Sequence, residues 1–246
     1  MLLRIGTAIF LFPVLSTDEI PVQAKAGLAF FLTLILFPTL PATVMPIPGN
    51  VPELFALALK EVYVGLIMGF SSTLFFAGLR IAGDWIDQET GFSMLQLFDP
   101  STQEPTTALG SLLIWLFTVL LLVSGGYLVL LQSLAESFQI IPLAGASWNG
   151  QGMFTVFARM SADAFVFGLK LAAPVLSAIL ISSLGLAVTS RIMPQMNVWL
   201  VGMPMKLLLG MITILFGLPV LWQVFQKNFD LWILQHEILI RLMGGS

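Results

Sequence analysis

The chain has 246 residues, of which 58% are hydrophobic and 9% are charged, with a formal net charge of −3 and a mean hydropathy of +0.98. Soluble domains carry about 25% charged residues, so the composition predicts an all-α integral membrane protein of six to seven apolar helices in a single domain over residues 1–246. The absence of cysteine excludes a disulfide framework, and the single histidine excludes a multi-histidine metal site. Neither a cofactor nor a nucleic-acid partner is predicted.

The first third of the chain predicts three helices. The apolar residues Met1 to Phe12 form the first, which we expect to be retained because Pro13 interrupts it and no clean cleavage site follows. Val22 to Phe37 forms the second, before a proline-rich loop at residues 38–52. Glu53 to Glu89 predicts a third helix of about 55 Å, nearly twice the hydrocarbon thickness of a bilayer, so it must project beyond the membrane or be broken.

An acid-rich stretch from Arg80 to Glu104 begins within this predicted helix and continues beyond its end. It lies between two apolar blocks of the sequence. Unpaired charges are costly in hydrocarbon, so the stretch must face water, a partner or an aqueous lumen. Arg80, Asp84 and Asp87 fall at i, i+4 and i+7, so one guanidinium could pair with two carboxylates. Together with Gln88 and Gly91, these residues are predicted to form the brace and hinge of the segment that follows.

That segment is short and apolar and ends at Asp99-Pro100. Its apolar residues are Phe92, Met94, Leu95, Leu97 and Phe98. A short apolar stretch behind a glycine hinge is a candidate for a moving plug. The alternative is a helix-to-helix turn that packs on its own chain.

The second half begins with an apolar run from Thr107 to Ser137, in which Gly125-Gly126 predicts a kink. Met153 to Thr189 predicts one long helix that contains Pro174.

Prolines and glycines dominate the prediction for the remaining chain. Arg191 to Lys206 contains two prolines and predicts a broken or re-entrant turn. Lys206 to Lys227 predicts an apolar segment interrupted by Gly217 and Pro219, and Asn228 to Met243 a separate final helix.

Motifs for chemistry are missing from the sequence. A serine nucleophile elbow and a phosphate-binding loop are both absent. A Ser–His dyad would have to use His236, which is expected to be a surface residue of the last helix. Gly65-x-x-x-Gly69 indicates close helix packing. We therefore predict no catalytic residue and no metal ligand.

Several motifs, in a shared order, resemble one family. They are I-P-x-x-x-K at Ile20 to Lys25, E-x-x-x-G-x-x-x-G-F at Glu61 to Phe70, the stretch Arg80 to Gly91, F-D-P at Phe98 to Pro100, L-A-A-P-V at Leu171 to Val175, R-x-x-P-Q-M-N-V at Arg191 to Val198, and V-G-x-P-x-K at Val201 to Lys206. This order and spacing resemble the FliR family of flagellar type III export gate subunits. Members usually carry more residues before the position of Arg4, so the first helix is expected to be short.

The resemblance implies a non-enzymatic channel subunit of the bacterial inner membrane at the flagellar basal body. Such subunits assemble with FliP and FliQ as helical hairpins of a multi-subunit channel, associate with FlhB and FlhA, contact membrane lipid and pass unfolded flagellar subunits. The family's plug maps to Phe92 to Phe98. Subunit packing is assigned to motif positions Gly65, Gly69, Pro174, Arg191, Pro194, Gln195 and Asn197.

Two alternatives stay open at this point. The first is the homologous injectisome subunit, which would have the same fold but export effectors. The second is a proton-coupled small-solute transporter that uses Asp84 and Asp87 as a proton relay. It predicts a self-sufficient monomer or homodimer.

Overall fold

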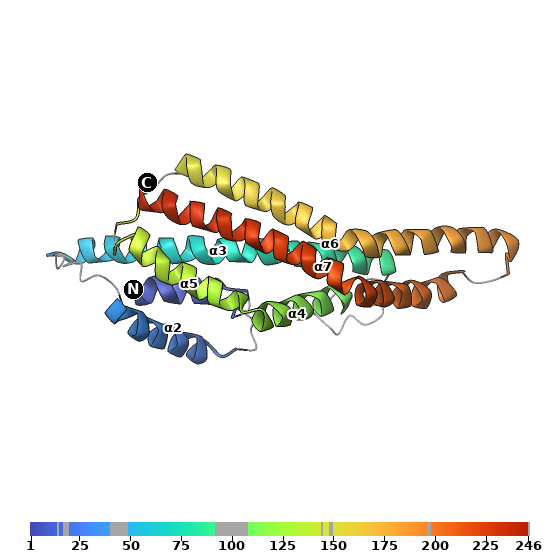
Figure 1. Ribbon diagram of the computed structural model, residues 1–246, viewed down its shortest axis with the longest axis horizontal. Coiled ribbons are helices and arrows are strands. Elements are labelled where there is room, and N and C mark those ends of the chain that lie inside the picture. The colour runs from blue at the N-terminus through green and yellow to red at the C-terminus, as the bar shows by residue number, and fades with distance from the viewer. Residues whose placement is uncertain are drawn as a thin grey trace. The chain divides into compact units, whose positions relative to one another are not determined.

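The computed structural model describes residues 1–13, 15–16, 20–39, 49–91, 108–143, 145–147, 150–195 and 198–245. Over these residues the chain forms seven α-helices and one short 3-10 helix, with no strand (Figure 1). The elements are α1 (Leu2–Leu11), α2 (Val22–Leu36), η1 (Phe37–Thr39), α3 (Val51–Thr90), α4 (Ala108–Val123), α5 (Gly126–Ile140), α6 (Gly150–Ile192) and α7 (Val198–Gly244). The predicted all-α membrane protein is confirmed.

Three helices are long and apolar enough to cross a membrane, namely α3, α6 and most of α7, and the pair α4 and α5 adds a fourth candidate if it is counted as one bent span. The 40 residues of α3 correspond to about 60 Å of helix, roughly twice the hydrocarbon thickness. As predicted for the segment from Glu53 to Glu89, this helix is too long to be contained within a bilayer that it crosses upright.

The glycine pair in the middle of the apolar run breaks it, which confirms the predicted kink. Helix α4 ends at Val123, α5 begins at Gly126, and their axes differ by 70°. Gly125 adopts φ 76°, a left-handed conformation that costs a residue with a side chain more than it costs glycine. The bend therefore depends on the identity of this residue.

The predicted breaks near the C-terminus are wrong in part. Only residues 193–197 separate α6 from α7, and α7 then continues for 47 residues through Pro204 and Pro219. Gly217 does not interrupt it, and no separate helix begins at Asn228. Proline removes one backbone hydrogen bond, but helices of membrane proteins tolerate this loss where neighbouring groups and packing compensate.

The contacts divide the chain into two compact units, and α3, α6 and α7 each contribute residues to both. Unit 1 comprises residues 1–75, 121–162 and 231–246, and unit 2 comprises residues 76–120 and 163–230. That the whole chain acts as one domain stays a prediction.

The core of unit 2 is built around Phe225 of α7. Its ring stacks on Phe117 of α4 at 4.9 Å between centroids and lies 6.2 Å from Phe167 of α6. All three side chains are almost fully buried. Aromatic pairs at these separations contribute about 0.5–1.5 kcal/mol beyond the burial of their area, so they fix α4 and α6 on α7.

Candidate functional site

The end of α3 in unit 2 is tied to the start of α4 by one carboxylate. Asp87 accepts hydrogen bonds from the backbone N–H groups of Leu109, at 3.1 Å, and Gly110, at 2.8 Å. Both N–H groups belong to the first turn of α4, where no carbonyl of the helix itself can accept them. The negative charge also interacts favourably with the positive end of the helix dipole. Asp87 thus caps α4 from 22 residues earlier in the chain.

The three residues of the predicted triplet, Arg80, Asp84 and Asp87, have different surroundings in the structure. Arg80 is exposed, Asp84 is half-buried, and Asp87 has no exposed surface. The two carboxylate oxygens of Asp87 bind backbone N–H groups of α4, a use that spacing along α3 alone could not reveal.

The junction between α3 and α4 is made compact by glycines. A Cβ atom on Gly83 would collide with the backbone of Gly110, so the two helices touch through their main chains. Gly78 and Gly168 allow the same close approach between α3 and α6. Contacts of this kind bring helix backbones closer than larger residues would permit.

Helix α3 ends at the predicted hinge. Gly91 follows Thr90 with φ 78°, and its N–H donates to the carbonyl oxygen of Gln88 at 3.2 Å. A left-handed glycine directly after the last helical residue is a common way to terminate a helix. The predicted plug residues Phe92, Met94, Leu95, Leu97 and Phe98 lie outside the described residues, so the plug stays a prediction. The structure does place its two flanking helices together at the Asp87 cap.

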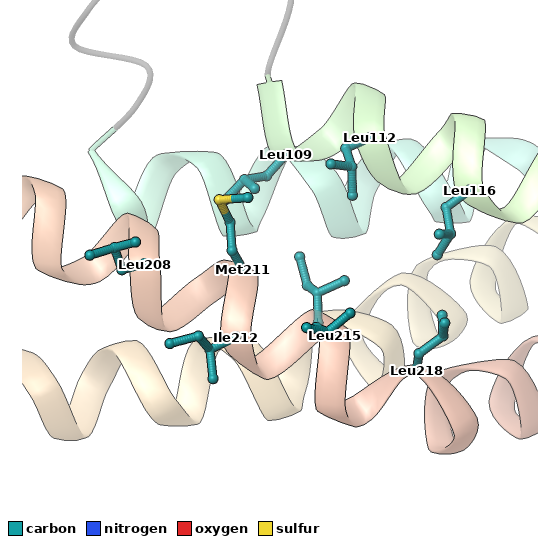
Figure 2. Close-up of a pocket in the computed structure, with 9 residues that line it drawn as sticks. Leu109, Leu112, Leu116, Leu208, Met211, Ile212, Leu215 and Leu218 are labelled. Carbon is teal, nitrogen blue, oxygen red and sulfur yellow. The ribbon is translucent and has the colours of Figure 1, made fainter.

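An apolar pocket of about 380 Å³ lies between α4 and α7 of unit 2 (Figure 2). Figure 2 shows Leu112 and Leu116 of α4 facing Met211 and Leu215 of α7. The residues that line it are Leu109, Leu112, Leu116, Leu208, Met211, Ile212, Ile214, Leu215 and Leu218. None of these side chains carries a strong hydrogen-bond donor or acceptor, so the pocket is not suited to bind a polar solute.

In unit 1, Gly65 and Gly69 pack closely within the chain, and their assignment to subunit packing stays a prediction. A Cβ atom on Gly65 would collide with Thr7 and with the carbonyl oxygen of Arg4, and one on Gly69 would collide with Leu11. The motif thus lets α1 lie directly on α3 of the same chain. Sequence spacing identified the close contact but could not tell which helix makes it.

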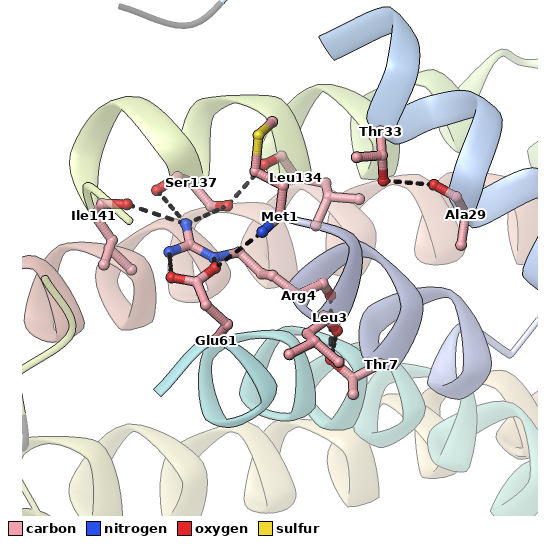
Figure 3. A network of polar contacts seen from close by, with 10 residues as sticks. All are labelled: Met1, Leu3, Arg4, Thr7, Ala29, Thr33, Glu61, Leu134, Ser137 and Ile141. Atoms are coloured by element: carbon pink, nitrogen blue, oxygen red, sulfur yellow. Dashed lines mark hydrogen bonds and ion pairs between the residues drawn. The ribbon is translucent and has the colours of Figure 1, made fainter. Parts of the chain in front are cut away.

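Beside this contact, Arg4 of α1 forms a buried network that the sequence analysis missed (Figure 3). Its guanidinium makes two hydrogen bonds of 3.0 Å to the carboxylate of Glu61 on α3. It also donates to the carbonyl oxygens of Ser137 and Ile141 at the end of α5, each at 3.1 Å, and lies 4.3 Å from the ring centre of Phe138. Arg4 is completely buried, so this single residue joins three helices.

The prediction that His236 is a surface residue is wrong. His236 is 3% exposed, and its Nδ1 atom lies 2.5 Å from the hydroxyl of Ser71. Trp232, one turn earlier on α7, donates from Nε1 to the carbonyl oxygen of Ser71 at 2.8 Å. Both contacts fasten α7 to α3 within unit 1. The i, i+4 spacing of Trp232 and His236 is the feature of the sequence that could have indicated a shared buried face.

This serine and histidine are not arranged as a catalytic pair. The Ser71 hydroxyl donates its only hydrogen to the carbonyl oxygen of Met68 at 2.8 Å and has no exposed surface. The histidine must therefore donate to the serine, the reverse of the arrangement that activates a nucleophile.

The remaining predicted packing residues that the structure describes are exposed. Pro174 lies within α6, Arg191 in its last turn, and Pro194 and Gln195 in the connection to α7. Asn197 lies outside the described residues. These exposed positions are available to another molecule, and their role in subunit packing stays a prediction.

Comparison with known proteins covers nearly the whole chain. Residues 1–232 match the family described as "Bacterial export proteins, family 1". The flagellar biosynthetic protein FliR of Bacillus subtilis (strain 168) is 30% identical over 247 residues, which is 99% of this chain and 94% of that protein. FliR of Escherichia coli (strain K12) is 31% identical over 85% of this chain and 79% of its own length.

A relative from another secretion system also matches. The Yop proteins translocation protein T of Yersinia pestis is 29% identical over 84% of this chain and 79% of that protein. The family match over residues 1–232 contains the segments that carry the α3–α4 junction and the α1–α3 contact. By its match over residues 1–232 and its likeness to the FliR proteins, the chain belongs to the bacterial export protein family 1.

Proposed function

We propose that this chain is a non-enzymatic channel subunit of the flagellar type III protein export gate in the bacterial inner membrane. The observation that carries the proposal is the match to a FliR protein over 99% of the chain and 94% of the relative. The export substrates would be unfolded flagellar subunits, which a pore can pass without a pocket specific for each.

The outer surfaces of the long helices support assembly with other subunits. Exposed apolar side chains follow one another along α6 and α7 in unit 2, among them Leu180, Ile181, Leu184, Leu215 and Phe216. Exposed apolar surface on this scale has to be covered by lipid or by another protein. In the proposed assembly FliP and FliQ cover part of it and lipid covers the rest, with FlhB and FlhA as further partners at the basal body.

The α3–α4 junction is the proposed base of the gate. Asp87 holds the beginning of α4 on the end of α3, and Gly91 starts the segment that carries Phe92 to Phe98. A segment whose two anchors are held together can close a pore without loosening the helices on either side. In this proposal Met94 and Leu97 supply the apolar seal.

Native mass spectrometry tests the assembly. The tagged chain is expressed with FliP and FliQ and extracted in a mild detergent. We expect one copy of this chain in a large complex that contains several copies of both partners. A monomer or homodimer that binds neither partner would contradict the proposal and favour the transporter alternative. The same experiment without either partner serves as the control for detergent-induced association.

The injectisome subunit is the second candidate. It is favoured by the Yersinia translocation protein, which is 29% identical to this chain and thus almost as similar as the FliR proteins. The two functions differ in cargo rather than in fold. Deletion of the gene in its own organism separates them: loss of flagellar filaments supports the flagellar function, and loss of effector secretion with normal motility supports the other.

A further inference from the structure

His236 has one ring nitrogen whose role is set by its surroundings. The Ser71 hydroxyl uses its hydrogen on the carbonyl oxygen of Met68, so at the 2.5 Å contact it can only accept. Nδ1 of His236 therefore carries the hydrogen of the neutral ring. A neutral imidazole carries one such hydrogen, so Nε2 presents a lone pair. None of the residues that the structure describes gives Nε2 a hydrogen bond, although the atom is buried.

A small polar pocket lies beside this ring, between α5 and α7 of unit 1. Its volume is about 140 Å³, and His236 is one of its walls. The polar residues that share the lining are Gln132, Ser133 and Glu136 of α5 and Glu237 of α7. A water molecule occupies about 30 Å³ in the liquid and needs two to four polar partners. The pocket therefore has both the room and the hydrogen-bonding groups for a few water molecules.

The polar and charged groups at the ring and its pocket come from α3, α5 and α7. On α3 the facing residue is the uncharged Ser71. On α5 it is Glu136, which accepts a hydrogen bond of 2.8 Å from Gln132. On α7 it is Glu237, which pairs with Arg241 at 2.6 Å on the exposed side. A positively charged ring would thus have two carboxylates at the same pocket.

We propose that His236 is a proton acceptor that takes up a proton at Nε2 from water in the pocket between α5 and α7. Hydronium transfers the proton to the Nε2 lone pair and leaves a neutral water molecule behind, while Nδ1 keeps its hydrogen and donates it to the Ser71 hydroxyl oxygen. The acceptor is a property of unit 1 alone and does not depend on the proposed export function. It makes this region of the protein respond to pH through one side chain.

The chain offers an unusually clean test, because it contains a single histidine. The full chain is labelled with ¹⁵N-histidine, reconstituted in lipid nanodiscs and followed by NMR between about pH 3 and pH 9. We expect the neutral form to carry its hydrogen on Nδ1 and to convert to the doubly protonated ring within this range. Opposite tautomer assignment, or a ring that stays neutral throughout, would overturn the proposal.

Two variants link the titration to the pocket. Glu136→Gln and Glu237→Gln each remove one carboxylate, and we expect the midpoint to move to lower pH in both. Glu53→Gln is the matched control, because it removes the same charge from an exposed position early in α3, and it should leave the midpoint unchanged. Equal midpoints in all four proteins would contradict the assignment of the pocket as the source of the proton.

Discussion

The carboxylate of Asp87 caps the first turn of α4 through the N–H groups of Leu109 and Gly110, although 22 residues of chain separate it from the nearer of the two. Asp87→Ala removes this cap and leaves two buried N–H groups without an acceptor. Loss of a helix cap costs about 1–2 kcal/mol of stability. We expect a lower melting temperature of the purified chain in detergent, with a smaller loss in Asp87→Asn, which retains one acceptor oxygen.

Asp84→Asn provides the comparison for this experiment, since Asp84 lies one turn earlier on α3 and is half-buried. It should change the melting temperature much less than Asp87→Ala does. If both variants behaved like the parent protein, the cap would have no energetic importance.

The buried pair of Arg4 and Glu61 should be strongly sensitive to the loss of one partner. Glu61→Gln leaves the guanidinium buried without its counter-charge, and breaking such a pair costs about 3–5 kcal/mol. We expect a corresponding loss in the free energy of unfolding measured by titration with SDS in mixed micelles. Replacing both residues with methionine should restore most of the stability, because apolar pairs often substitute well for buried ions.

The chain contains an exposed ion pair that calibrates this result. Arg241 and Glu237 lie 2.6 Å apart at i, i+4 on α7, and both side chains are well exposed. Arg241→Gln should cost no more than about 0.5 kcal/mol. A loss for Glu61→Gln as small as that would mean that the Arg4 network is not important for stability.

The contact between α1 and α3 should not tolerate a single added methyl group. Gly65→Ala places a Cβ atom against the backbone of Arg4, which can move only if α1 moves. Overpacking of this kind costs about 1–3 kcal/mol. Gly27→Ala is the control, because none of the residues that the structure describes lies within 4 Å of its Cβ position on α2, and it should be neutral or slightly stabilising. Equal unfolding free energies for the two variants would refute the close approach.

Opening of the proposed gate can be measured as a leak. Met94→Ala combined with Leu97→Ala should raise the ion conductance of membranes that contain the assembled complex, because the apolar seal loses volume. Leu59→Ala combined with Leu66→Ala removes similar side chains from exposed positions on α3 and should not raise it. Unchanged conductance in the double variant at 94 and 97 would contradict the assignment of the plug.

Local signals in the sequence predicted the helices well and their partners poorly. The start of α2 at Val22, the end of α3 near Gly91 and the break at Gly125 follow from proline and glycine, whose effects act on the neighbouring backbone. The continuous course of α7 through Pro219 was missed because proline was taken as a helix break, whereas helices of membrane proteins tolerate internal prolines.

The partners of the polar residues were predicted even less well than those of the helices. Asp87 belongs to the predicted triplet, but spacing along α3 does not reveal that its carboxylate binds N–H groups of the next helix. His236 was assigned to the surface because it lies in an amphipathic tail, and its contact with Ser71 joins residues far apart in the sequence. Ser71 gives no signal of its own, since serine is common in membrane helices. Only the three-dimensional arrangement joins these residues.

The Arg4 network also sets an order of events during synthesis. Its partners are Glu61, 57 positions later, and the carbonyl oxygens of Ser137 and Ile141, 133 and 137 positions later. A guanidinium in hydrocarbon without a counter-charge costs several kcal/mol. We therefore expect α1 to take its final place only after α3 has been made and has brought the carboxylate. The contacts of Arg4 with the end of α5 can form only after Ile141 has been made.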